Sequence, residues 1–274
     1  MQLIPIHAGH LSCDGGALFG VVPKPLWSKT YPADKNNITK LTMRCLLIDL
    51  GERKILVDAG VGNHYSEKFR QNNGHEETDV MEQSLAGKGY RVEDITDVLF
   101  THLHCDHSNG AVLNENGQLK LQFPNATHWC SKRQWEHSKI SNIRERAAYF
   151  PEILNFLKSE GNMKLIGDDC ELFPGISVRL FDGHTTGLLV PVIHTEEKTV
   201  VYPADLIPTA AHIPIVWLPA YDLYPVTSME EKERFLKEAA EKEYILFFEH
   251  DIYTECATVE WTEKGPMMKE IFRL

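Results

Sequence analysis

The amino-acid sequence predicts a layered α/β protein with two similar halves, and the order of its apolar segments indicates this fold class. Strand-like apolar runs come in consecutive groups, and helical segments follow them in each half. No low-complexity or linker-like stretch interrupts the chain. We therefore expect one domain over residues 1–274, with its halves at roughly 1–165 and 166–274.

In the first half, four apolar runs predict strands and a longer stretch predicts helix. Two runs separated by a Gly-Glu pair, "MRCLLIDLG" and "RKILVDAGVG", predict a β-hairpin. The run "ITDVLFTH" predicts a buried strand that ends at Thr101-His102, and "NATHWCS" predicts another. From "SKRQWEHS" to "FPEILNFLKSEG" we expect helix, with Gly161 as its stop.

The second half repeats this order of strands followed by a helix. Strands are predicted at "GISVRLFDG", "LLVPVIHTE" and "KTVVYPAD". The segment "TSMEEKERFLKEAAEKE" is rich in strong helix formers, and Ser228 with Glu231 has the spacing of a capping box at its start. A last buried strand is predicted at "YILFFEHD".

Composition and charge exclude several classes of partner. The 28 basic and 39 acidic residues give a net charge of −11, which repels nucleic acid. The basic stretches are short, and "IRER" (143–146) is interrupted by Glu145. No secretory signal and no membrane-spanning apolar run is visible, and the six cysteines lack regular spacing. We expect a cytoplasmic protein with reduced thiols and no membrane partner.

The segment "FTHLHCDHSNG" (100–110) gathers three histidines and an aspartate at the end of a predicted strand. His102 and His104 are expected to project from the same edge, and Asp106 and His107 can face back toward them from the following turn. Neutral imidazole and carboxylate are good ligands for zinc and related ions. Binding a cation would relieve the cost of grouping these side chains, so the segment predicts a metal site.

Three further polar residues terminate apolar runs and are candidates for the remaining ligands. His184 lies in "FDGHTTG", Asp205 follows "TVVYPA", and His250 follows "YILFFE". A polar side chain at the end of a buried strand is costly unless something pairs with it. Each residue alone could cap a turn or be a buried polar residue whose hydrogen bonds are made within the core. Together, the three residues favour metal binding.

Over residues 40 to 255, the chain resembles the metallo-β-lactamase superfamily of binuclear hydrolases. The resemblance lies in the order of its motifs: H-x-H-x-D-H, then G-H-T, then an Asp and a His that each end a strand. This resemblance implies a four-layer αβ/βα sandwich with two divalent metal ions per chain, zinc first and iron, manganese or cobalt as alternatives. The implied ligands of the first metal are His102, His104 and His184. Those of the second are Asp106, His107 and His250, with Asp205 bridging the two.

Other segments resemble the branch that contains quorum-quenching N-acyl-homoserine lactonases and methyl-parathion-type hydrolases. They are "DGGALFGVVPKPLW", "ADLIPTAAH", "YDLYP" and "ILFFEHD". The resemblance implies a metal-bridging hydroxide that attacks a lactone or ester carbonyl, with an N-acyl-homoserine lactone as the first substrate candidate. It also implies a small-molecule partner and allows a homodimer, which is common in that branch.

Several residues are candidates for supporting roles. Asp106 and Asp205 are expected to act in catalysis as well as in binding, and Asp58 to orient a ligand histidine or cap a turn. Where branch members carry a tyrosine after the bridging aspartate, this chain has Pro208 and Thr209. His212 is then the nearest titratable group, with Tyr221 and Tyr224 as alternatives.

The apolar segment from Leu18 to Trp27 could line a substrate pocket or pack in the core. We take Leu18, Phe19, Trp27 and His212 as candidate substrate-binding residues. The remaining histidines have no partner at a suitable spacing, so we expect them to be structural or solvated; they are His7, His10, His64, His75, His128, His137 and His194.

Other functions would use similar ligands. An organophosphate or phosphoester hydrolase needs the same metals, and only the substrate pocket distinguishes it. A di-iron redox protein of this fold usually replaces the second histidine of the motif with glutamate, and His104 argues against it. A non-catalytic metal module would have a closed, cysteine-rich site of four ligands, unlike the seven predicted here.

Overall fold

The computed structural model describes all residues, 1–274, and groups them into two compact units. Unit 1 contains Met1–Leu11 and Thr42–Gly167, and unit 2 contains Ser12–Leu41 and Asp168–Leu274. The later boundary lies close to the division expected from the sequence. Residues 12–41, which we expected in the first half, are grouped with the second unit instead.

Unit 1 is built on a six-stranded sheet with the order β1-β2-β3-β4-β7-β8. The predicted hairpin is confirmed, because β2 and β3 pair antiparallel. Strands β3, β4, β7 and β8 pair in parallel. The bounds are β1 Gln2–Asp14, β2 Ile38–Asp49, β3 Lys54–Val57, β4 Asp97–Leu99, β7 Thr127–Ser131 and β8 Met163–Ile166.

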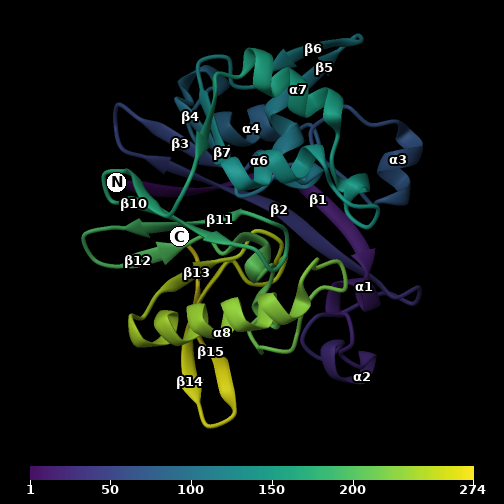
Figure 1. Cartoon of the computed structure of the whole chain (residues 1–274), viewed down its shortest axis with the longest axis vertical. Coiled ribbons are helices and arrows are strands. Elements are labelled where there is room, and N and C mark those ends of the chain that lie inside the picture. Colours follow the sequence, from purple (N-terminus) through teal and green to yellow (C-terminus); the bar gives the residue numbers. More distant parts are fainter. The chain divides into compact units, whose positions relative to one another are not determined.

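The core of unit 1 lies between this sheet and short helices. Its fully buried members include Leu47 and Leu56 on the strands, and Leu157 on α7. Helices α6 and α7 pack against β7 and β8 (Figure 1). The stretch that we expected to be helical up to Gly161 forms two separate helices, α6 and α7, and Gly161 ends the second as predicted. The helices are α3 Glu67–Asn72, α4 Met81–Ala86, α5 Cys105–Ser108, α6 Lys132–Lys139 and α7 Pro151–Glu160, and a hairpin forms from β5 Val112–Glu115 and β6 Gln118–Leu121.

Unit 2 is built on a seven-stranded sheet with the order β15-β14-β13-β12-β11-β10-β9. All neighbouring pairs are antiparallel except β12 and β13, which are parallel. The bounds are β9 Cys170–Phe173, β10 Ile176–Phe181, β11 Leu188–His194, β12 Thr199–Val201, β13 Ile245–Phe247, β14 Cys256–Thr262 and β15 Gly265–Phe272.

The long helix of unit 2, α8 (Pro225–Glu241), packs along β14 and β15. The predicted capping box at its start is wrong. The helix begins at Pro225, whose fixed φ suits the first turn, so Ser228 lies inside the helix. Glu231 instead accepts hydrogen bonds from the main-chain amides of Asp182 and Gly183, at 2.9 Å each. No helix of the structure combines the length and the apolar character needed to cross a membrane.

Residues 12–41 join unit 2 through main-chain contacts. They form the end of β1, the short helices α1 (Gly15–Phe19) and α2 (Lys24–Trp27), and the start of β2. The amide of Ala220 donates to the carbonyl of Ala17 at 2.7 Å, which ties α1 to the segment before α8. These contacts link positions far apart in the sequence, so the apolar pattern alone could not reveal them.

Candidate metal centre

The residues predicted as metal ligands fall into two sets, one in each unit. We refer to them as the unit 1 ligands and the unit 2 ligands, and each set is described within its own unit. The unit 1 ligands are His102, His104, Asp106 and His107, and the unit 2 ligands are His184, Asp205 and His250.

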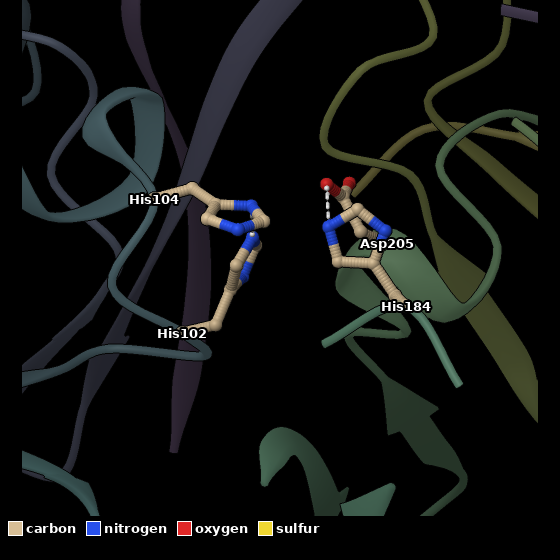
Figure 2. A group of neighbouring side chains, drawn as sticks. All are labelled: His102, His104, His184 and Asp205. Atoms are coloured by element: carbon tan, nitrogen blue, oxygen red, sulfur yellow. Dashed lines mark hydrogen bonds and ion pairs between the residues drawn. The ribbon is translucent and has the colours of Figure 1, made fainter. Parts of the chain in front are cut away.

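His102 and His104 lie in the loop between β4 and α5. The strand ends at Leu99, earlier than the sequence predicts, so the loop rather than the strand pleat sets their direction. The Nε2 atom of His102 lies 2.9 Å from the Nδ1 atom of His104. Figure 2 shows the two rings turned toward each other. Two ring nitrogens converging in this way can share one cation.

Asp106 and His107 follow on the single turn of α5. The amide of His107 donates to the carbonyl of His104 at 3.1 Å, and its carbonyl accepts from the amide of Ala59 at 2.8 Å. These main-chain bonds fix the turn. The Nε2 atom of His107 then lies 3.7 Å from a carboxylate oxygen of Asp106. The unit 1 ligands therefore form two donor pairs.

Asp58 holds the outer side of His107. Its carboxylate accepts from the amide and the hydroxyl of Thr101, both at 2.7 Å, and lies 3.0 Å from Nδ1 of His107. Both Asp58 and His107 are fully buried. A carboxylate on Nδ1 directs the other ring nitrogen, Nε2, away from it and toward Asp106. The sequence allowed Asp58 either to orient a ligand histidine or to cap a turn, and this contact is the one that the first role needs.

Glu145 contacts the outer ring nitrogen of His104 in the same way, and no pattern in the sequence indicated this residue. Its Oε1 lies 2.9 Å from Nε2 of His104 and accepts from the hydroxyl of Tyr149 at 2.7 Å. Its Oε2 lies 2.5 Å from Nε2 of His137. The only signal in the sequence was a glutamate inside a short basic stretch, which gives no hint of a partner so far along the chain.

In unit 2, Asp205 lies between two histidines. One carboxylate oxygen is 3.1 Å from Nε2 of His184, and the other is 3.2 Å from Nε2 of His250. Figure 2 shows the first of these contacts as a dashed line. Each oxygen thus faces a different histidine. A carboxylate arranged in this way can bridge two cations.

The loop that carries His184 is fixed by α8 and the segment before it. Gly183 lies so close to the start of α8 that a Cβ atom would come within 2.4 Å of Ser228. The carbonyl of His184 accepts from the amide of Leu223 at 3.0 Å, and its Nδ1 lies 2.9 Å from the carboxylate of Asp222. Burial opposes a charge on this ring, but the two neighbouring aspartates raise the pKa of His184 to about 10.

The donor atoms suit a divalent metal ion. Atoms bound to one tetrahedral zinc ion at 2.0–2.2 Å lie about 3.3–3.5 Å apart. Within the two units the donor pairs are 2.9 to 3.7 Å apart, a range that includes that spacing. All the donors are imidazole nitrogens or carboxylate oxygens, a set that zinc, iron, manganese and cobalt accept. The residues therefore fit divalent cations of this kind.

His212 is fully buried in the interior of unit 2, and both of its ring nitrogens face internal partners. Its Nδ1 is 2.8 Å from the hydroxyl oxygen of Thr209, and its Nε2 is 2.8 Å from the carbonyl of Leu18. Phe19 stacks on the ring with centroids 4.7 Å apart, and Trp27 stacks on Phe19. Burial lowers the pKa of His212 to about 3. These contacts suit a neutral structural histidine rather than a proton donor.

The candidate substrate residues of the N-terminal segment are packed in the same interior. Leu18 and Phe19 are fully buried, and Trp27 is 1% exposed. Of the two arrangements that the sequence allowed for this segment, the contacts match core packing. The side chains leave almost no surface with which a substrate could make contact.

Tyr221 has a more suitable position than His212 for contact with a substrate. Its ring stands edge-on to that of His184, with centroids 6.3 Å apart, and the residue is 41% exposed. Tyr224 is also exposed, but it immediately precedes α8 and its amide donates to the carbonyl of Gly183. Of the alternatives to His212, Tyr221 is the one whose ring contacts a predicted ligand.

Unit 2 also contains an apolar pocket of about 430 Å³. The segments that follow Asp205 and His250 in the sequence both contribute to it, through Ala210 and Asp251. The carboxylate of Asp251 is already engaged, because it accepts from the main-chain amide of Ala210 at 2.9 Å. The pocket therefore offers mainly apolar contacts. Its larger lining side chains are Tyr31, Ile213, Trp217, Tyr253, Met267 and Met268.

Comparisons with known proteins agree with the family expected from the ligand order. A sequence profile of the metallo-beta-lactamase superfamily matches residues 44–250. The structure of a probable metal-dependent hydrolase from Staphylococcus aureus superimposes with a TM-score of 0.89 at 31% identity, covering 99% of this chain and 96% of that one. These two findings confirm the predicted α/β fold.

Several relatives are N-acyl homoserine lactonases. The Bacillus thuringiensis enzyme is 28% identical over 230 residues, which is 80% of this chain and 84% of that enzyme. The Bacillus cereus enzyme is 27% identical over 175 residues, 60% of this chain, and the match spans 63% of its length, less than two thirds. The dizinc quorum-quenching lactonase AidC has a TM-score of 0.81 over 99% of this chain and 95% of its own, but at 22% identity it is similar in fold alone.

Proposed function

The chain belongs to the metallo-beta-lactamase superfamily and is a metal-dependent hydrolase, and from this premise we propose that it hydrolyses lactones at a centre of two divalent cations. The first substrate class to test is the N-acyl homoserine lactones, because relatives in Bacillus thuringiensis and Bacillus cereus carry that name. Zinc is the first candidate for both cations, since the donors are imidazole and carboxylate groups.

The observation that carries this proposal is the pairing of donors within each unit. Asp205 directs one oxygen toward His184 and the other toward His250. In unit 1, His102 pairs with His104, and Asp106 lies beside His107. We propose that His184 completes the first pair and His250 completes the second, with Asp205 shared.

When bound, the cations would lower the pKa of water and polarise a substrate carbonyl. The side chains around the ligands would orient them and accept or donate protons. Asp58, Glu145 and Asp222 each lie at the outer nitrogen of one predicted ligand histidine and orient its inner nitrogen, where a bound cation would take the place of a proton. Asp106, the one carboxylate among the unit 1 ligands, is partly exposed and can accept a proton from the substrate.

Tyr221 is our candidate for the group that assists at the reacting carbonyl. Its hydroxyl can donate to a developing oxyanion, and its ring already contacts His184. His212 was the candidate favoured by the sequence, but both of its ring nitrogens lie at hydrogen-bond distance from internal partners. We therefore propose Tyr221 in its place.

The apolar pocket of unit 2 is our candidate for the acyl chain of the substrate. Hydrophobic lining favours an alkyl group, and the pocket includes residues that closely follow Asp205 and His250. Ala211 lies on its wall, so Ala211→Phe would partly fill it. We expect this variant to lose activity on long-chain lactones while keeping activity on short-chain ones, as measured by kcat/KM across a chain-length series.

The experiment that tests the function combines metal analysis with kinetics. We expect purified protein to contain close to two metal ions per chain, to hydrolyse N-acyl homoserine lactones, and to lose this activity when the metals are chelated. The same preparation should be assayed on aryl esters and a phosphotriester. A higher kcat/KM on the phosphotriester would favour the organophosphate alternative, and activity retained without metal would overturn the mechanism.

Two further expectations remain predictions. We propose that the protein works in the cytoplasm, and that two copies associate as in the lactonase branch. Cell fractionation and light scattering on the purified protein test them. Neither outcome changes the assignment of the metal ligands.

A further inference from the structure

Two histidines and a glutamate form a second group of metal-binding side chains, all within unit 1 and separate from the unit 1 ligands. His7 and His10 lie on β1, and Glu77 lies in the segment between α3 and α4. One oxygen of Glu77 is 3.1 Å from Nε2 of His7 and 3.3 Å from Nδ1 of His10. The three donor atoms lie within 4.8 Å of one another.

A glycine brings the two histidines to one face of the strand. Residues three apart on a regular strand point to opposite faces. Gly9 has a φ of +118°, which interrupts the alternation between them. The rings of His7 and His10 consequently lie side by side, with centroids 4.6 Å apart.

The same glycine lets the segment that carries Glu77 approach. A Cβ atom on Gly9 would come within 2.8 Å of the carbonyl oxygen of Glu77. Next to it, the amide and carbonyl of His10 pair with those of Glu76, at 2.8 and 2.9 Å. Glu77 itself has a φ of +52°, a left-handed conformation that a side chain adopts at a cost. The backbone therefore holds the carboxylate of Glu77 beside one nitrogen of each ring.

We propose that His7, His10 and Glu77 form a peripheral binding site for a divalent transition-metal ion such as Zn²⁺. The distances from Glu77 to the two ring nitrogens match the spacing of about 3.3 Å expected around tetrahedral zinc. The three side chains are only partly buried, with 38%, 29% and 60% of their surface exposed. Water can therefore complete the coordination. Two imidazoles and one carboxylate favour Zn²⁺ over Mg²⁺ or Ca²⁺.

This site does not depend on the proposed lactonase activity, and its test separates the two. Tag-free protein is equilibrated by dialysis against buffered Zn²⁺ at pH 7.5, and bound zinc per chain is measured by elemental analysis. We expect one equivalent beyond those held by the unit 1 and unit 2 ligands. Removing a supporting contact of a metal ligand already weakens binding about 10–100-fold. The double variant His7→Gln/His10→Gln should therefore lose that equivalent.

Two variants sharpen the result. Glu77→Gln keeps the shape of the side chain but removes its charge, and it should weaken the extra equivalent at least about tenfold. His194→Gln changes an exposed histidine of unit 2, next to Thr199, and should leave zinc binding unchanged. Conversely, His102→Ala should lose zinc from the main centre and keep the peripheral equivalent.

Circular dichroism must show that each variant is folded. The proposal is overturned if wild-type protein takes up no extra equivalent in millimolar Zn²⁺, or if the folded His7→Gln/His10→Gln variant retains it. In either case the group is a metal-free ion pair between Glu77 and two histidines. That result would leave the lactonase proposal unaffected.

Discussion

Three of the predicted ligand histidines and two core histidines of this protein have different hydrogen-bond partners. His104, His107 and His184 each have a carboxylate on the outer ring nitrogen, from Glu145, Asp58 and Asp222. His128 and His212 instead face neutral oxygens, a carbonyl of Gly161 in one case and Thr209 and Leu18 in the other.

This difference indicates what each ring can do. A carboxylate partner favours a strongly basic inner nitrogen, which suits metal binding. A neutral partner in an apolar interior favours an uncharged ring, and burial lowers the pKa of both His128 and His212. Among these five histidines the partner therefore separates the predicted ligands from the packing residues, whereas His102 has the hydroxyl oxygen of Thr101 3.1 Å from its Nδ1.

The largest effect should come from removing a ligand. We expect His104→Ala or Asp205→Ala to lose bound metal and to lower kcat/KM by about 1,000-fold or more, because the cations supply the nucleophile. His128→Asn removes a buried histidine of the other class and should keep the metal content of the wild type. Elemental analysis beside lactone kinetics measures both. Equal metal loss in His128→Asn would break the comparison.

The next effect concerns the exposed ring beside His184. We expect Tyr221→Phe to lower kcat/KM about 100-fold with no loss of metal, because it removes only a hydroxyl that donates in the reaction. Tyr224→Phe is the matched control. Should Tyr221→Phe keep full activity while the folded His212→Gln variant loses it, the neutral class would contain the catalytic group after all.

A smaller effect should follow from changing one outer carboxylate. Glu145→Gln keeps the size of the side chain but weakens its hold on His104, and we expect metal affinity to fall about 10–100-fold. Competition with a chelator measures this affinity. Glu136→Gln, on the exposed side of α6, should leave it unchanged. An unchanged affinity in Glu145→Gln would show that the carboxylate partner is not what distinguishes the two classes.

The smallest effect should be a pH dependence of the free energy of unfolding, which arises from a buried histidine with neutral partners, His212. The ordinary pKa of histidine is about 6.5, so the unfolded chain binds a proton below that pH, whereas folded His212 does so only near a pKa of about 3. The contribution of His212 to the free energy of unfolding is therefore complete above pH 6.5. Below that pH the contribution decreases by up to about 1.4 kcal/mol per pH unit.

Urea unfolding at pH 7.5 and 5.5 tests this dependence. The gap in unfolding free energy between wild type and His212→Asn should narrow by about 1 kcal/mol at the lower pH. Comparing the two proteins at each pH removes the contributions of histidines they share. A gap that widens toward acid would mean that folded His212 is charged.

The sequence predicted the unit 1 ligands more securely than their surroundings, for a physical reason. Four ligands within six positions share one loop and one turn, so local geometry alone brings them together. Glu145 reaches His104 across a large sequence separation, and no local pattern marks it. The unit 2 ligands could be proposed only because each terminates an apolar run.

The errors in the helices and the N-terminal segment have the same origin. Ser228 and Glu231 have the spacing of a capping box, but Pro225 starts α8 first and Glu231 binds the amides of a distant loop. The apolar segment from Leu18 to Trp27 gave no indication of which surface it would meet. Its partner His212 lies far along the chain, and only the folded structure joins them.

The membership of residues 12–41 in unit 2 bears on any attempt to divide this protein. A cut after Gly167 would leave this segment on the N-terminal fragment, although the C-terminal fragment packs against it. The carbonyl of Leu18 accepts a hydrogen bond from His212, and that of Ala17 accepts one from the amide of Ala220. The C-terminal fragment alone would expose apolar surface and aggregate. When the two fragments are mixed, they should associate and restore the folded structure. This chain therefore suits a split-protein complementation reporter better than separate expression of its two units.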